Sequence, residues 1–246
     1  MAFPEVEHCL QGAAQFTTTH WSVVLAAARE PSPEASHALA ELCGTYWYPL
    51  YAYVRRKGYD VSDAQDLTQG FFAKFLEKNY VGAVDRRKGK FRSFLLASLE
   101  HFLAKQWTRA HRLKRGGGQI IIPLDASDPE ERYRLELFDD WTAERIYERR
   151  WALTVLEQAM FALKSEYAAR ERLFNALQPF ISGEDDAVSY AELAARLKMN
   201  KGTVRMAVHR LRQRYAEAVR NEIARLVQRP EEIEEELRHL FASLSQ

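Results

Sequence analysis

Cysteine, glycine, proline and long apolar runs are all scarce in this chain of 246 residues, which has only 2 Cys, 11 Gly and 8 Pro. Cys9 and Cys43 stand apart from any CxxC pair or Cys/His cluster, so the sequence predicts neither a disulfide framework nor a zinc site. The longest apolar runs, such as residues 120–122, fall far short of the roughly 20 residues that span a bilayer, and no apolar signal segment is present. We therefore expect a soluble, cytoplasmic protein without a membrane contact.

The net charge is only +1, but the charges are arranged in blocks along the chain. Residues 86–115 contain ten Lys or Arg and a single Glu, residues 125–148 contain nine acids and three bases, and residues 198–214 contain six bases and no acid. Two basic blocks separated by an acidic one suggest two surfaces that face phosphates, joined by a segment that does not touch nucleic acid. Two solvated basic faces are the alternative.

Helical periodicity dominates the sequence, and no run alternates with period two for long enough to predict a sheet, so the expected fold class is all-α. A helix that begins at Ser62 would have a capping box formed with Gln65. Gly58 is placed to end the preceding helix, and the triple glycine at 116–118 to end the long basic helix. Helices are expected over residues 19–29, 36–57, 62–78, 91–113, 151–167 and 170–177.

A helix-turn-helix is predicted near the end of the chain. Ser189 can cap a short helix, the turn is Lys198-Met199-Asn200, and Asn200 can cap the helix that follows. That second helix has one apolar stripe, and its opposite face presents Gly202, Met206, His209 and Gln213, flanked by Arg205 and Arg210. Such a helix packs with one side and meets a major groove with the other.

The arginines and lysines of this helix have different expected roles. Arg205, near the helix N-terminus, can reach base edges or phosphates. Lys201, Arg212 and Arg214 are interpreted as phosphate contacts that set position without reading sequence.

The helix expected over 91–113 carries a basic stripe on one side, formed by His101, Lys105, Arg109 and Arg112. A stripe of this kind can follow a nucleic-acid backbone. Trp107 lies nearer the apolar side, so we expect it in the core rather than as a platform on which an unpaired base stacks.

Three segments, in this order, resemble bacterial RNA polymerase sigma factors of the extracytoplasmic-function type. Residues 62–76 (SDAQDLTQGFFAKFL) are similar to the polymerase-docking helix of that family, and residues 90–99 (KFRSFLLASL) with the basic stripe are similar to its promoter-melting and minus-ten-reading segment. Residues 189–215 resemble its module that reads the minus-thirty-five element, with NKGTV at 200–204 and VHRLR at 208–212. The Asp-x-x-Arg that is usual in the basic helix of the family is Gln106-Trp-Thr-Arg109 here, so individual base contacts are not carried over.

The resemblance implies a transcription-initiation factor that binds core RNA polymerase and promoter DNA, without a cofactor and without enzymatic activity of its own. By this resemblance Asp63, Asp66 and Gln69 meet the docking surface of the large polymerase subunit, and residues 79–90 help to capture a flipped base. An anti-sigma factor or another regulator is left open as a further partner. The expected DNA-binding residues are Lys90, Arg92, Lys105, Arg109, Arg112, Lys201, Thr203, Arg205, Met206, His209, Arg210 and Arg212.

Four segments follow from this interpretation: a polymerase-docking and minus-ten module at 1–115, an acidic linker at 116–150, the helix-turn-helix module at 151–229 and an acidic amphipathic helix at 230–246. Fully extended at about 3.3 Å per residue, the linker could reach roughly 115 Å. The acidic helix has two open interpretations. It either packs on the helix-turn-helix module, or folds over a basic DNA-binding face and competes with phosphates.

Two other functions compete with the sigma-factor interpretation. An ordinary helix-turn-helix regulator would bind an operator without docking on polymerase. A nucleic-acid enzyme is the third class, but the sequence contains no Walker loop, metal triad or nucleophile constellation to support it.

Overall fold

The fold was analysed in a computed structural model, which describes residues 33–77, 90–112, 130, 133, 141–181, 189–227 and 229–245. All regular secondary structure in these ranges is helical, which confirms the predicted all-α class. Within the same ranges, no helix is both long enough and apolar enough to cross a membrane. The helix expected over 19–29 lies outside the described residues.

The first three described helices begin and end close to their predicted limits. Helix α2 spans Pro33–Arg56 and is followed by Gly58, whose φ of +95° is the left-handed conformation expected of a helix-ending glycine. Helix α3 spans Val61–Glu77, and α4 spans Phe91–Arg112. The predicted capping box of Ser62 is wrong, because the side chain of Asp60 accepts the hydrogen bond from the backbone N–H of Asp63, at 2.8 Å. Asp60 therefore caps α3, and Ser62 lies inside it.

Helix α6 spans Ala143–Glu166, so it begins eight residues before the predicted start at Trp151. Thr142 caps it by accepting a hydrogen bond from the backbone N–H of Arg145, at 3.2 Å. Residues 143–150, expected in the acidic linker, therefore form the first two turns of a helix. Most of these residues are charged, so the sequence did not indicate a packed helix. In the structure, Ile146 and Tyr147 form an apolar face that is buried.

The described helices pack around two hydrophobic cores. The first core joins α2, α3, α4 and residues 143–159 of α6 to the second half of α9, which spans Lys201–Leu226, and to α10, which spans Ile233–Ser245. The second core joins Leu163, near the end of α6, to the helices of the helix-turn-helix region. These helices are α7 (Glu171–Leu177), η4 (Gln178–Phe180), α8 (Tyr190–Leu197) and the first half of α9.

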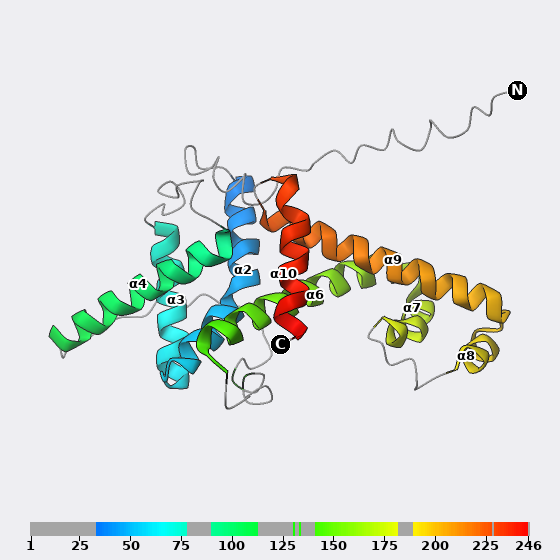
Figure 1. Cartoon of the computed structure of the whole chain (residues 1–246), viewed down its shortest axis with the longest axis horizontal. Coiled ribbons are helices and arrows are strands. Elements are labelled where there is room, and N and C mark those ends of the chain that lie inside the picture. The colour runs from blue at the N-terminus through cyan, green and yellow to red at the C-terminus, as the bar shows by residue number, and fades with distance from the viewer. Residues whose placement is uncertain are drawn as a thin grey trace, which may run out of the picture.

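Helices α6 and α9 therefore contribute to both cores, and they connect the two ends of the molecule (Figure 1). At 1.5 Å per residue, the 26 residues of α9 extend over about 39 Å. The cores do not coincide with the modules expected at 1–115 and 151–229, since the second half of α9 packs with the N-terminal helices. The connection between the cores is a pair of continuous helices.

The acidic C-terminal helix is present, as η5 (Pro230–Glu232) followed by α10. Helix α10 packs against α6 and α9 and buries Ile233 and Leu240 in the first core. At its far end, Leu244 O accepts a hydrogen bond from Arg149 Nη1 on α6, at 2.9 Å. Its contacts with α6 and α9 agree with the interpretation that the tail packs on the module expected at 151–229, but the core that it completes is the first one, shared with the N-terminal helices.

Candidate nucleic-acid interface

The first helix of the helix-turn-helix is α8, and a capping box holds its start. Ser189 Oγ accepts a hydrogen bond from the backbone N–H of Glu192 at 3.2 Å, and the Glu192 carboxylate accepts one from the backbone N–H of Ser189 at 3.0 Å. Both donors would otherwise be unsatisfied at the helix end. The predicted cap at Ser189 is confirmed.

The turn between the two helices has the predicted three residues. Lys198 adopts the left-handed conformation with φ of +53°, which reverses the chain directly after α8. Asn200 Oδ1 then accepts hydrogen bonds from the backbone N–H of Thr203 at 2.7 Å and from its hydroxyl at 2.9 Å. The predicted cap at Asn200 is confirmed, and the hydroxyl of Thr203, an expected DNA contact, is hydrogen-bonded to this cap.

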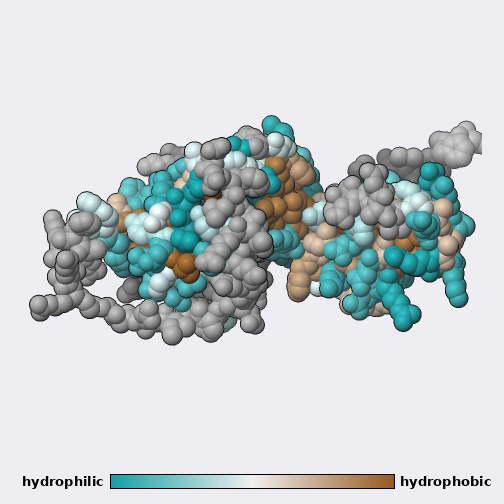
Figure 2. Space-filling view, turned by 90° about the horizontal axis from the view of Figure 1, so that it is seen from below, coloured by the Kyte–Doolittle hydropathy of each residue, from teal (hydrophilic) through white to brown (hydrophobic). Residues whose placement is uncertain are grey.

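The two faces of α9 differ as the sequence predicts. Val204, Val208 and Leu211 are buried in the second core against Leu193 of α8 and Phe174 of α7. The side chains on the other faces are exposed and mostly basic. They are Lys201, Arg205, Met206, His209 and Arg210. Figure 2 shows that much of the surface at this end of the molecule is hydrophilic.

Arg205 lies at the junction of the two helices. Its guanidinium lies 5.8 Å from the centroid of the Tyr190 ring on α8, so a cation–π contact restrains an otherwise exposed side chain. Restraining the side chain before binding reduces the entropy that it would lose on DNA. The structure thus holds a guanidinium close to the N-terminal end of the candidate recognition helix.

One basic residue of this surface was not predicted from the sequence. Arg170, in the short helix η3 (Ala168–Arg170), lines the same hollow as Arg210 and Met206, with a volume of about 610 Å³. It extends the basic surface from α9 onto η3. The residue is 40 positions from Arg210 in the sequence, and no local pattern marked it.

Arg212 occupies a different position from the other predicted DNA contacts. Its Nε donates a hydrogen bond to the backbone oxygen of Phe180 at 2.9 Å, which links α9 to η4. This bond fixes the helix-turn-helix to the preceding helices. Arg212 therefore has a structural function in addition to its predicted contact with phosphate.

On α4, the predicted basic stripe is only partly described. His101 and Lys105 are exposed, whereas the side chains of Arg109 and Arg112 lie outside the described residues. Trp107 was expected in the core and is instead 61% exposed. Trp107 follows Phe102 and Leu103, the last residues of α4 in the first core, and its position beyond that core explains the difference.

Lys90 and Arg92, at the start of α4, form ion pairs with acidic residues of other helices. Lys90 Nζ pairs with Glu235 of α10 at 2.9 Å and with Glu236 at 3.4 Å. Arg92 is only 5% exposed, pairs with Glu236 and, at 2.9 Å, with Glu148 of α6. In this structure Arg92 does not face solvent, which corrects its assignment to an exposed DNA-binding surface.

We refer to Arg92, Glu148 and Glu236 as the Arg92 cluster. The Arg92 guanidinium also lies 4.9 Å from the centroid of the Trp151 ring. Burial lowers the pKa of Arg92, but Glu148 and Glu236 outweigh burial, so the net shift is upward and the guanidinium stays charged. No local sequence pattern indicates this cluster, because Glu236 lies 144 residues from Arg92.

The predicted polymerase-docking residues lie along α3. Asp63 and Asp66 are exposed, and Gln69 is half-buried. Buried residues of the same helix, Phe71, Phe72 and Phe75, pack into the first core and hold α3 in place. The two carboxylates are therefore presented on a helix whose other side is fixed.

Among the described residues, no group of three or more His, Cys, Asp or Glu is placed to hold a metal ion. Cys43 is a free cysteine, and burial raises the pKa of its thiol to about 12. Searches with protein-family models, curated proteins and solved structures gave no match to this chain.

Proposed function

We propose that the chain is a transcription-initiation factor of the sigma type, which binds core RNA polymerase and directs it to promoters without catalytic activity of its own. The observation that carries the proposal is the presence of two exposed, oppositely charged surfaces in one chain. Asp63 and Asp66 lie on α3, and a basic face lies on α9 of a capped helix-turn-helix. Their order along the chain is the one that the resemblance to sigma factors requires.

In the proposed complex, α9 enters the major groove of the minus-thirty-five element. Its N-terminal residues approach base edges, as in other helix-turn-helix proteins. Arg205 is suited to base readout, because a guanidinium can donate two hydrogen bonds to guanine. Lys201 is suited to a phosphate contact. Arg170 adds a further phosphate contact beside Arg210.

The proposed minus-ten surface is the exposed side of α4, with His101, Lys105 and Trp107. Helix α4 reaches one end of the long axis of the molecule, whereas α8 and the start of α9 form the other end (Figure 1). Two nucleic-acid surfaces at opposite ends support contact with two separated promoter elements. Because α6 and α9 connect the two cores, we propose that these helices set the spacing in the free protein.

An operator-binding regulator is the second candidate, and one observation favours it. The continuous helices α6 and α9 join the two cores and so connect the two candidate DNA-binding surfaces, whereas most of the linker expected at 116–150 lies outside the described residues. A pull-down with core RNA polymerase in the absence of DNA separates the two functions. Retention of the chain on the polymerase supports the sigma factor, and absence of retention supports the regulator.

Replacing Arg205 by Ala is expected to cost about 1–3 kcal/mol of binding free energy on the preferred promoter and to change the preferred upstream sequence. Lys201→Ala is the matched variant, since Lys201 is an exposed cation one turn earlier on α9. Lys201→Ala is expected to weaken binding to all promoter sequences equally. It should also lower, by about 1, the magnitude of the slope of log K for DNA binding against log salt concentration. Fluorescence anisotropy on a panel of promoter variants measures both effects. An equal loss from Arg205→Ala on every sequence would show that Arg205 only positions the helix.

Replacing Glu235 by Gln is expected to strengthen binding of the free protein to promoter DNA by up to about fivefold, because Glu235 forms an exposed and therefore weak ion pair with Lys90. The change removes the exposed partner of Lys90 and leaves the buried Glu236 in place. The gain should be largest at low salt. Glu231→Gln, which removes the same charge from the exposed start of the tail, should leave the affinity unchanged. If both variants bind like the wild type across a salt series, the tail does not compete with DNA at Lys90.

A further inference from the structure

A hollow of about 610 Å³ lies along one side of the candidate recognition helix, where η3, α7 and the turn before α9 meet the first half of α9. This volume is within the range of about 300–1,000 Å³ that is usual for small-molecule sites. A basic helix can follow the major groove of DNA without such a hollow beside it. The hollow is therefore a feature that DNA binding alone does not explain.

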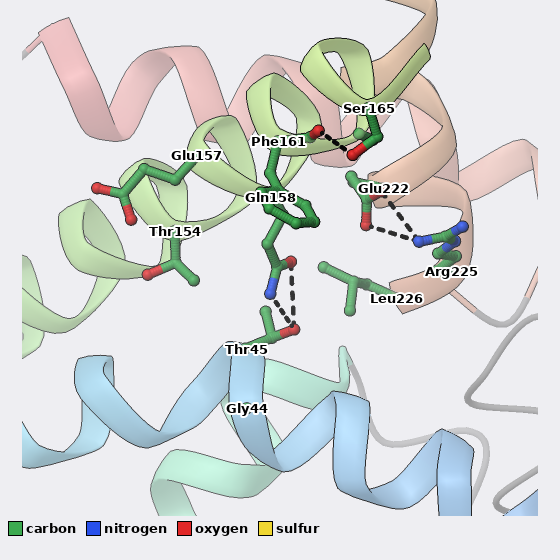
Figure 3. Close-up of a pocket in the computed structure, with 11 residues that line it drawn as sticks. Gly44, Thr45, Thr154, Glu157, Gln158, Phe161, Ser165, Glu222, Arg225 and Leu226 are labelled. Carbon is green, nitrogen blue, oxygen red and sulfur yellow. Dashed lines mark hydrogen bonds and ion pairs between the residues drawn. The ribbon is translucent and has the colours of Figure 1, made fainter. Parts of the chain in front are cut away.

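Both charged side chains that line the hollow in the described part of the chain are cationic. They are Arg170 and Arg210, and no Asp or Glu is among the described lining residues. Neither guanidinium forms an ion pair within the described part of the chain. A larger hollow of about 740 Å³ between α2, α6 and α9 differs in this respect, because its Arg225 pairs with Glu222 at 3.0 Å (Figure 3). The two arginines beside α9 thus leave a positive charge that an anion can neutralise.

The other large side chains of this hollow are apolar or aromatic. They are Tyr167, Leu173, Leu177, Met199 and Met206. The two methionines are 36% and 54% exposed. Methionine is flexible and polarisable, and its sulfur makes favourable contacts with aromatic rings. An inorganic anion would gain nothing from these side chains, so the hollow favours an anion with an apolar, aromatic body.

Asn200 adds a hydrogen-bond donor to the same hollow. Its Oδ1 already accepts hydrogen bonds from the backbone N–H and the hydroxyl of Thr203, at 2.7 and 2.9 Å, which fix the side chain. The amide NH₂ of Asn200 is left to donate. The described lining therefore offers donors from three side chains and no carboxylate, which again favours an anionic acceptor.

We propose that this hollow is a binding site for a small aromatic carboxylate. The carboxylate binds to Arg170 and Arg210, because guanidinium groups pair with carboxylates through parallel N–H donors. The aromatic body packs on Met199 and Met206. Since Met206 and Arg210 also belong to the candidate DNA face of α9, the bound ligand excludes DNA, and this consequence rests on the proposed function, whereas binding of the ligand does not.

Nuclear magnetic resonance of the full-length chain with ¹³C-labelled methionine methyl groups tests binding without DNA or polymerase. The probe is 2-naphthoate, and 2-naphthamide, with the same rings and no charge, is its matched control. Naphthoate is expected to shift the signals of Met199 and Met206 with a dissociation constant of about 1 mM or lower. The signal of Met160, which packs against the second core and does not line the hollow, should stay unchanged. Naphthamide should bind at least about fivefold more weakly.

Replacing Arg170 or Arg210 by Gln is expected to weaken naphthoate binding at least about fivefold, because each change removes charge-assisted hydrogen bonds. Arg172→Gln is the matched variant, since Arg172 is an exposed arginine of α7 that does not line the hollow. It should bind naphthoate like the wild type. The proposal is overturned by equal binding of naphthoate and naphthamide, by unchanged affinity in both hollow variants, or by the absence of shifts at Met199 and Met206.

Fluorescence anisotropy with promoter DNA, at constant ionic strength, tests the exclusion of DNA. Naphthoate near saturation should weaken DNA binding of the wild type at least about fivefold, and naphthamide at the same concentration should have no effect. Naphthoate that binds in the hollow and leaves the DNA affinity unchanged would overturn the exclusion of DNA. A chain that binds naphthoate as expected but binds no DNA would support the ligand site and count against the proposed function.

Discussion

Replacing Glu236 by Ala is expected to lower the free energy of unfolding by about 3–5 kcal/mol, because it leaves the Arg92 guanidinium buried without one of its two counter-charges. Arg92 and Glu236 have side chains only 5% and 7% exposed, and their charges meet between α4 and α10. Water cannot replace the missing carboxylate at such a site without opening the core. Urea denaturation monitored by circular dichroism measures the loss.

The adjacent residue provides the control for this experiment. Glu235 pairs with Lys90, but its side chain is 61% exposed, so Glu235→Ala is expected to leave the free energy of unfolding close to the wild-type value. Substitution by Ala is thus expected to change the free energy of unfolding little at the exposed Glu235 and strongly at the buried Glu236. A loss below about 1 kcal/mol for Glu236→Ala would contradict a structural role of the Arg92 cluster.

Reversing the charge of both Asp63 and Asp66 to Lys is expected to weaken binding to core RNA polymerase by at least about a hundredfold. An interface that pairs opposite charges loses that attraction and gains like-charge repulsion, which costs several kcal/mol. Both side chains are exposed, so the helical content should stay near the wild-type value. The loss of favourable charge near the start of α3 should cost only about 0.3–1 kcal/mol of stability.

A matched double variant is Glu166→Lys with Glu171→Lys, which makes the same change of charge on exposed residues outside α3. It should bind polymerase in the absence of DNA like the wild type. Biolayer interferometry with immobilised polymerase gives both affinities. If the folded Asp63→Lys, Asp66→Lys protein binds polymerase with wild-type affinity, these two residues are not part of the docking surface.

Local signals in the sequence predicted the helix-turn-helix well. The caps at Ser189 and Asn200 and the exposed side of α9 depend on contacts between residues that are close in sequence. The end of α2 at Gly58 is of the same kind. Such contacts depend on backbone geometry and side-chain spacing, which a sequence records directly.

Contacts between distant segments could not be predicted in this way. Arg92 was assigned to a DNA-binding surface because its immediate neighbours are basic, whereas its counter-charges come from Glu148 and Glu236 on other helices. The start of α6 was missed for a related reason, since its charged residues 144–150 suggest a solvated linker. Only the packing of α2 and α10 on α6 shows that one of its sides is buried.

Transcription in vitro tests the proposed function most directly. Core RNA polymerase from the organism that encodes the chain would be incubated with a library of upstream fragments from the same genome, with and without the purified protein. The proposed function predicts transcripts with discrete new start sites that appear only when the protein is present and disappear with Asp63→Lys, Asp66→Lys. Stable binding of the protein to library DNA, with no retention on core polymerase and no new transcripts, would contradict it.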